Sequence, residues 1–158
     1  MTVTEAKDGP FLLSTDPARL QVDRIHRYLA YESYWCVEIP KHIVQKAIDH
    51  SLCFGIYDES KPDHPQVAYA RVVTDYATFA WICDVYVEKE YRGKGLSKWM
   101  MRQLVDHPDL KGLRRLCLAT VAAHKLYEQV GFTVTKTPGS WMEIKDNDIY
   151  KKMQSRPI

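Results

Sequence analysis

The sequence predicts a mixed α+β domain in which helices flank one central sheet. Apolar residues at helical spacing occupy the first third of the chain, after Pro17 and again after Pro40. From Ser51 onward the spacing changes to that of β-strands, which later alternate with helical segments. Helices, then a meander of strands, then alternating strands and helices are typical of an α+β fold with one sheet.

The whole chain, residues 1–158, is predicted to form a single domain. This length is sufficient to bury a core, and 46% hydrophobic with 27% charged residues is ordinary for a globular protein. No internal repeat, linker or low-complexity tract divides the chain. The ends, residues 1–10 and 151–158, are expected to be mobile.

Two helices are expected before the sheet. Asp16 can cap a helix and Pro17 suits its first position, so the first helix is expected from there to about Ala30. Pro40 opens the second helix, whose apolar side is formed by Ile43, Val44, Ala47 and Ile48.

The remaining elements follow from strand-like and helix-like runs. A tight connection at residues 75–77 predicts that two of the strands form an antiparallel pair. A turn ending in Gly95 opens a helix near Leu96 that Pro108 ends, and another helix is expected over Ala122–Val130. The expected strands are Leu52–Tyr57, Val67–Thr74, Thr78–Val87, Leu113–Thr120, Phe132–Thr135 and Trp141–Ile144.

Charge and composition argue against several classes of partner. The net charge is +2 and no basic run reaches five residues, so no nucleic-acid partner is expected. No stretch approaches 18 apolar residues and the N-terminus has no apolar signal segment, so no membrane partner and a cytoplasmic location are expected. The cysteines are far apart in sequence and form no CxxC or Cys/His cluster, which predicts buried thiols and no metal site. Two disulfides would allow three pairings of Cys36, Cys53, Cys83 and Cys117.

A short turn before the third predicted helix carries the clearest chemical signal. Gly93 and Gly95 lack a Cβ atom, so their backbone can approach a bulky anion, and the helix N-terminus that follows favours phosphate. Arg92 and Lys94 add positive charge. These features predict a pyrophosphate site, although a plain tight turn would carry the same glycines. Two better-known phosphate loops do not fit, because GxGxxG would need a glycine at Lys98 and GxxxxGK[ST] is absent.

This turn resembles the acyl-CoA signature of the GNAT superfamily of N-acetyltransferases, [QR]-x-x-G-x-[GA]. Arg92 and Gly95 match its first two fixed positions, and Ser97, also a small residue, replaces the final glycine or alanine. The segment Ala123–Phe132 looks like a second motif of the superfamily, A-x-x-L-Y-x-x-x-G-F. The order of the predicted elements agrees over nearly the whole chain.

The resemblance implies a GNAT-like fold, whose central, mostly antiparallel sheet contains a β-bulge and a splay between two strands. It also implies acetyl-CoA as the co-substrate, with the pantetheine arm in that splay and no metal. The residues implied to line the splay are Val85, Tyr86 and Val87. Those implied to wrap the pyrophosphate with backbone N–H groups are Arg92, Gly93, Lys94, Gly95, Leu96 and Ser97.

Two residues are candidates for catalysis. Tyr127 occupies the position of the superfamily's tyrosine acid, and a phenol with a pKa near 10 can donate a proton to the departing thiolate. The alternative is a core aromatic. Asp84 is a carboxylate in an otherwise apolar strand, so it handles a proton or substrate, or it pairs with Arg71 on the preceding strand. His124, one turn before Tyr127, could touch substrate or cofactor, although a histidine at a helix start is more often structural.

The acceptor implied by the resemblance is a primary amine. A small free amine, an amino acid, an antibiotic, or a protein N-terminus or lysine all stay open. Tyr31, Tyr34 and Trp35 lie between the first two helices, where they either pack against the sheet or wall the acceptor site. Homodimers are common in the superfamily, usually through the C-terminal strands, so a homodimer is a further expectation.

Two other functions compete with an acetyltransferase. A non-catalytic acyl-CoA-binding domain would keep the glycine turn, but it would need neither Asp84 nor Tyr127. A nucleotide-binding protein could use the same turn for ATP or a dinucleotide, but no Lys-Ser/Thr pair follows the turn and no acidic ribose partner in a parallel βαβ unit is apparent.

Overall fold

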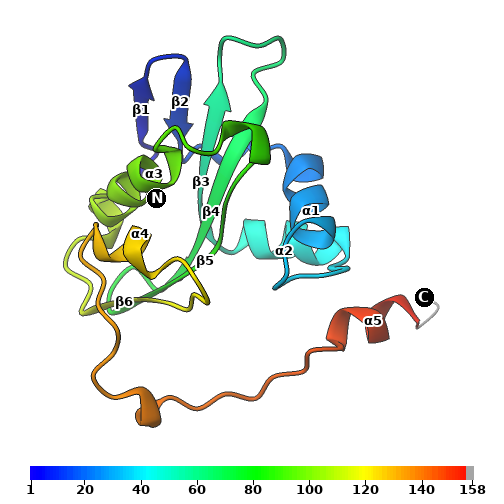
Figure 1. The fold of residues 1–158 in the computed structure, drawn as a ribbon, viewed down its shortest axis with the longest axis vertical. Coiled ribbons are helices and arrows are strands. Elements are labelled where there is room, and N and C mark those ends of the chain that lie inside the picture. Colours follow the sequence, from blue (N-terminus) through cyan, green and yellow to red (C-terminus); the bar gives the residue numbers. More distant parts are fainter. Residues whose placement is uncertain (156–158) are drawn as a thin grey trace.

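The computed structural model describes residues 1–155, which fold around one six-stranded sheet (Figure 1). The strands are β1 (Glu5–Asp8), β2 (Phe11–Ser14), β3 (Leu52–Asp58), β4 (Gln66–Thr74), β5 (Phe79–Val87) and β6 (Arg115–Leu118). They lie side by side in sequence order, and every neighbouring pair is antiparallel except β5 and β6, which are parallel. The predicted α+β class with a mostly antiparallel central sheet is confirmed.

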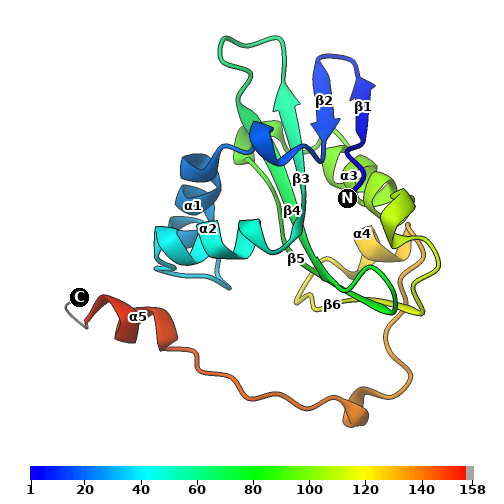
Figure 2. The same ribbon diagram turned by 180° about the vertical axis from the view of Figure 1, so that it is seen from behind.

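Helices cover both faces of this sheet. The described residues form α1 (Val22–Tyr31), α2 (Lys41–Asp49), α3 (Leu96–Val105), α4 (His124–Glu128) and α5 (Ile149–Gln154). Helices α1 and α2 pack on one face, and α3 and α4 pack on the other, as Figures 1 and 2 show from opposite sides. Among the described residues, no helix is long and apolar enough to cross a membrane.

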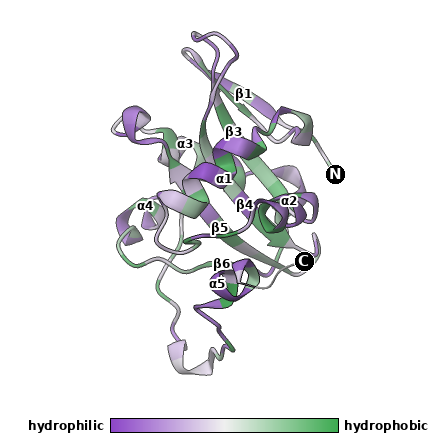
Figure 3. Ribbon diagram, turned by 90° about the vertical axis from the view of Figure 1, so that its right-hand side faces the viewer, coloured by the Kyte–Doolittle hydropathy of each residue, from purple (hydrophilic) through white to green (hydrophobic). Residues whose placement is uncertain are grey.

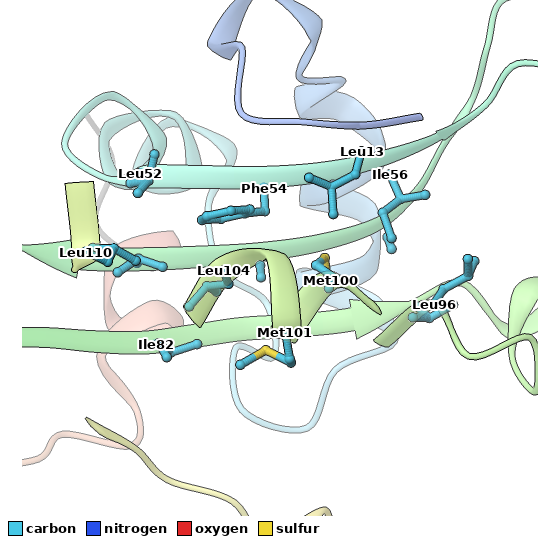
Figure 4. Packing of buried hydrophobic residues seen from close by; sticks show 14 of the residues in the cluster. Leu13, Leu52, Phe54, Ile56, Ile82, Leu96, Met100, Met101, Leu104 and Leu110 are labelled. Carbon is cyan, nitrogen blue, oxygen red and sulfur yellow. The ribbon is translucent and has the colours of Figure 1, made fainter. Parts of the chain in front are cut away.

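Two hydrophobic clusters hold these layers together. The larger cluster lies between the sheet and α3, whose Met100 and Leu104 are fully buried near Phe54 of β3 (Figure 4). The smaller cluster lies under α1 and α2, where the rings of Tyr28 and Tyr86 stack with centroids 3.8 Å apart. Strand β3 is buried along its whole length, and the central strands are hydrophobic in Figure 3.

The first predicted helix is interrupted. Asp16 caps a short 3-10 turn, Pro17–Arg19, by accepting a hydrogen bond from the amide of Ala18 at 2.9 Å, but α1 begins only at Val22. The chain is extended in between because Gln21 is bonded to the start of β4: its amide and its side-chain oxygen each pair with Gln66 at 2.9 Å. This cross-link was not visible in the sequence.

Both ends of the chain contain regular elements. Residues expected at a mobile N-terminus pair as β1 with β2, and Thr2 donates hydrogen bonds to Asp109 at 2.7 and 2.9 Å. The C-terminal end contains α5, where the side chain of Gln154 donates to the carbonyl of Glu38 at 2.8 Å. The last part of the predicted C-terminal end, residues 156–158, lies outside the described residues.

The prediction of strands over Phe132–Thr135 and Trp141–Ile144 is wrong, because the structure has no strand in either segment. Instead, an extended arm leaves the domain after α4 and runs to α5 on the other side (Figures 1 and 3). The alternating apolar pattern is strand-like, but a strand needs a neighbouring backbone, and the arm has none among residues 1–155. Met142 and Ile144 are consequently almost fully exposed, at 96% and 106%.

The buried imidazole of His107 predicts acid sensitivity. This ring is 1% exposed and packs edge-on against Phe54, and burial lowers its pKa from the usual 6.5. The unfolded chain therefore binds a proton at a higher pH than the folded protein does. We expect the free energy of unfolding to fall as the pH drops below about 6.5, and a His107→Gln variant to show a weaker fall.

Urea denaturation of both proteins at about pH 7 and about pH 5 measures this difference. The remaining titratable groups are common to the two proteins, so they cancel in the comparison. An equal loss of stability in the variant would contradict the assignment.

Candidate active site

The site is built on an irregularity in β5. Tyr69 of β4 faces Tyr86 and Arg71 faces Cys83, so β5 places both Asp84 and Val85 opposite one residue of β4. This is a β-bulge, and its first residue, Asp84, has a left-handed backbone conformation with φ of 56°. The predicted bulge is confirmed, and it redirects the end of β5.

Beyond the bulge, β5 separates from β6. The two strands pair only where Phe79–Ile82 faces Arg115–Leu118. The rest of β5, Cys83–Val87, has no strand beside it on that edge within the described residues. The predicted splay is therefore present, and Val85, Tyr86 and Val87 lie along its open side.

The turn after β5 presents unpaired backbone amides. Gly93 and Gly95 are left-handed, with φ of 78° and 77°, and Gly95 is the N-cap of α3 without a side-chain cap. The amides from Gly93 through Ser97 have no backbone acceptor among the described residues. A Cβ atom added to either glycine would meet no atom within 4 Å, so the turn is open beside both glycines, and amides at a helix N-terminus favour an anion.

The positive side chains of this turn have different surroundings. Arg92 donates from Nε to the carbonyl of Val87 at 3.0 Å and from Nη2 to the hydroxyl of Tyr28 at 2.9 Å. Its guanidinium therefore fastens the turn to β5 and α1. Lys94 is exposed at the turn, and among residues 1–155 it forms no salt bridge.

Tyr127 lies on α4 next to β6. Its ring is 8% exposed, packs edge-on against Phe132 at 6.0 Å, and lines a cavity together with Thr120 and His124. Burial, and after it the neighbouring Tyr34, raises the pKa of Tyr127. The phenol therefore stays protonated at neutral pH and can act as a donor.

Asp84 makes the ion pair that was one of its two predicted roles. Its Oδ2 accepts from Nε of Arg71 at 2.7 Å, and its Oδ1 accepts from the indole N–H of Trp35 at 3.1 Å. Both carboxylate oxygens are thus engaged, and the side chain is 7% exposed. Asp84 connects the bulge to the loop between α1 and α2.

Residues 21–132 of the chain match the family model described as "Acetyltransferase (GNAT) family". The chain belongs to the GNAT family. Among solved structures, a GNAT protein from Xanthomonas campestris pv. campestris is 48% identical, with a TM-score of 0.82 over 89% of this chain and 96% of that one. The protein FG08082 of Gibberella zeae, whose name places it among acetyltransferases, is 34% identical over 75% of this chain and 76% of its own.

A more distant GNAT fold provides a comparison of shape. An acetyltransferase from Clostridium acetobutylicum, solved with acetyl-CoA, is 17% identical and has a TM-score of 0.59 over 91% of this chain and 95% of that one. At this identity the likeness concerns the fold. The GNAT fold expected from the two motifs is therefore confirmed by both sequence and structure.

The cysteine thiols of this GNAT protein are buried or half-buried. All four cysteines are free. Burial, followed by the charge of Asp84, raises the pKa of Cys36 and of Cys83 to about 12, so neither is an ionised nucleophile at neutral pH. No group of three or more His, Cys, Asp or Glu side chains in the described part of the chain could hold a metal ion.

Sequence reasoning missed two contacts of the site. The bond of Arg92 to Tyr28 of α1 and the bond of Trp35 to Asp84 join residues that are 64 and 49 positions apart in the chain. Neither follows from spacing along one element. The only available signal was that Asp84 is a charge in an apolar strand, which requires partners without identifying all of them.

The Arg71–Asp84 pair predicts a specific stability effect. Replacing arginine in Arg71→Met leaves a buried carboxylate without its positive partner, so we expect a loss of about 3 kcal/mol in the free energy of unfolding. Adding Asp84→Asn should recover part of that loss because it removes the stranded charge.

Urea denaturation measures these free energies, with Lys7→Met as the control. Lys7 pairs with Glu59 at 3.0 Å but is 67% exposed, so its loss should cost less than about 1 kcal/mol. Equal losses at the two sites would contradict a structural role for the buried pair.

Proposed function

We propose that the protein is an acetyl-CoA-dependent N-acetyltransferase that transfers the acetyl group directly to a primary amine. The observation that carries this proposal is the row of free amides at Gly93–Ser97, directly after the splayed end of β5. Membership of the GNAT family supports it. The Clostridium acetobutylicum relative solved with acetyl-CoA supports the choice of co-substrate.

The turn and the splay are proposed to bind different parts of acetyl-CoA. Amides from Gly93 to Ser97, with the positive end of α3, bind the pyrophosphate, and Lys94 adds charge at its edge. Ser97 fits this role because its own amide is among the free ones. The open edge of β5 at Val85–Val87 offers backbone groups to the pantetheine arm, as a neighbouring strand would use them.

Tyr127 is the proposed general acid. Acetyl-CoA supplies a thioester, and transfer forms a carbon–nitrogen bond while the carbon–sulfur bond breaks. The amine must lose one proton and the departing sulfur must gain one. Burial keeps the Tyr127 phenol protonated, which suits it to give that proton to the sulfur.

Asp84 is proposed to position the acceptor loop. Its oxygens are occupied by Arg71 and Trp35, so it holds this loop against the bulge. Beside it, Tyr34 and Trp35 are 68% and 39% exposed and meet edge to face at 5.0 Å. Exposed aromatic rings next to Tyr127 favour the acceptor-wall role that the sequence had left open, because such rings attract an ammonium group.

Binding of acetyl-CoA tests the anion site. We expect calorimetric titration to give a dissociation constant in the micromolar range for the wild type, and at least about tenfold weaker binding for Gly95→Glu. The new side chain brings a negative charge to the position proposed for the pyrophosphate. No binding by the folded wild type would overturn the proposed function.

Gly112→Glu is the matched control for this experiment. Gly112 is also left-handed, with φ of 87°, and it also faces open space, so both variants carry a similar backbone strain of about 1–2 kcal/mol. It precedes β6, at the end of the sheet opposite to the turn. We expect this variant to bind acetyl-CoA like the wild type.

Measurement of turnover tests the proposed role of Tyr127 as the general acid. With the best amine from a screen read by release of free CoA thiol, we expect Tyr127→Phe to lower kcat at least about 100-fold. Binding of acetyl-CoA should be unchanged, because the hydroxyl is assigned to the leaving group only. Unchanged turnover would remove Tyr127 from the mechanism, and absence of turnover with every amine would favour the non-catalytic acyl-CoA-binding alternative.

Tyr57→Phe is the matched control for the loss of a hydroxyl. The Tyr57 hydroxyl is buried and has no hydrogen-bond partner among the described residues. Its removal leaves no donor or acceptor stranded, so turnover and stability should stay close to the wild-type values.

A further inference from the structure

The C-terminal helix lies against the loop between α1 and α2. Helix α5 follows the extended arm and lies on the same side of the sheet as α1 and α2 (Figures 1 and 2). Its Tyr150 packs against the smaller hydrophobic cluster, and the side chain of Gln154 donates to the carbonyl of Glu38 at 2.8 Å. Glu38 belongs to residues 32–40, which we call the aromatic loop. Two segments that are distant in sequence therefore meet beside the proposed acceptor wall.

Tyr150 brings an aromatic ring close to the bulge of β5. Cys36 of the aromatic loop packs against the same hydrophobic cluster as Tyr150, and its thiol donates to Oδ1 of Asp84 at 3.8 Å. Burial raises the pKa of the Tyr150 phenol, and the neighbouring Cys36 and Asp84 raise it further. Tyr150 therefore lies in the same part of the site as Asp84.

Tyr34 extends this aromatic lining toward the proposed acid. Its ring meets that of Trp35 edge to face at 5.0 Å, and the indole of Trp35 is fixed by its bond to Asp84. Tyr34 is also close enough to Tyr127 to raise the pKa of that phenol, after the larger effect of burial. Aromatic side chains therefore extend from Tyr150, past Asp84, to the end of the site where the thiolate is proposed to leave.

The charges beside these rings are paired with each other. Nε of Arg71 donates to Asp84 at 2.7 Å, and its Nη1 donates to the hydroxyl of Ser51 at 3.2 Å. The two charged side chains are 19% and 7% exposed. An acceptor that carries a carboxylate or a second ammonium group gains no partner from this pair, so the pair does not favour an amino acid or a polyamine.

Large apolar side chains of both segments remain exposed. On the aromatic loop these are Tyr34, Trp35 and Val37, and on α5 they are Ile149 and Met153. Apolar side chains that gather on a protein surface mark a site of interaction. A ligand with an aromatic ring suits this lining, because edge-to-face or offset contacts between rings add to the gain from burial.

We propose that the acceptor is a small arylalkylamine, a primary amine joined to an aromatic ring by a short alkyl chain, and that Tyr150 takes part in selecting it. This inference rests on the proposed acetyl transfer. The ring of the acceptor packs against Tyr150 and the aromatic loop, and its amino group extends to the splay of β5. The acceptor is thereby selected by its apolar body as well as by its amine.

Calorimetric titration with phenethylamine tests this ring site without any turnover. Ethylamine is the matched ligand, because it has the same amino group and no ring. We expect the wild type to bind phenethylamine at least about tenfold more tightly than ethylamine. Equal affinities would overturn the inference. Tighter binding of phenylalanine, which adds a carboxylate to phenethylamine, would also overturn it.

Titrations with and without saturating CoA keep two failures apart. If the protein does not bind CoA, the proposed function fails at the anion site, and the preference for phenethylamine over ethylamine is still measured on the protein alone. If the protein binds CoA and shows no preference for the ring, the arylalkylamine inference fails and the proposed function stands.

Variants of Tyr150 test its part in the selection. Tyr150→Ala removes the ring, so we expect the affinity for phenethylamine to fall at least about fivefold more than the affinity for ethylamine. Tyr150→Phe restores a ring and should recover the preference, because the role is assigned to the ring. An equal fall for both amines in Tyr150→Ala would indicate that Tyr150 only holds α5 in place, and it would overturn the assignment.

Tyr76→Ala is the matched control for the loss of a tyrosine. Tyr76 is also partly exposed, at 40%, but it lies in the turn between β4 and β5, at the end of β5 opposite to the splay. We expect this variant to keep the wild-type preference for phenethylamine. A loss of preference as large as that of Tyr150→Ala would show that the ring is not bound at α5.

Discussion

The buried pair of Asp84 and Arg71 is the interaction on which the working edge of this sheet depends. Asp84 is unfavourable in two ways: its backbone is left-handed, and its charge is buried in an apolar strand. The Arg71 guanidinium offsets the cost of the buried charge, because its Nε donates to Oδ2 of Asp84 at 2.7 Å. The bulge held in this way directs β5 away from β6. The open edge of β5 follows from that separation.

Glycine and arginine have separate tasks in the turn after β5. Gly93 and Gly95 adopt backbone conformations that aim the amides outward, and α3 adds its dipole behind them. Arg92 holds the turn in place through Val87 and Tyr28. A motif of three fixed positions therefore combines the amides proposed to bind the anion with the contacts that hold the turn in place.

Most of the fold and part of the site could be predicted from the sequence. Periodicity located the helices and central strands, and the two motifs located the turn and Tyr127, because each depends on neighbours along the chain. The break before α1 depends on Gln66, 45 residues from Gln21, and no local pattern reports such a bond. In the arm, the local pattern predicted a strand that the structure does not contain. Met142 and Ile144 have the spacing of a strand, but within residues 1–155 no neighbouring strand pairs with them.

The bond from Arg92 to Tyr28 has a consequence for how the two substrates affect each other. Tyr28 lies in the last turns of α1, and the chain continues from there into the loop of Tyr34 and Trp35. The anion site and the aromatic loop are therefore attached to the same helix. In the proposed function, acetyl-CoA bound at the turn and an amine bound at the loop would both act on α1, and any coupling between their two affinities would be equal in both directions.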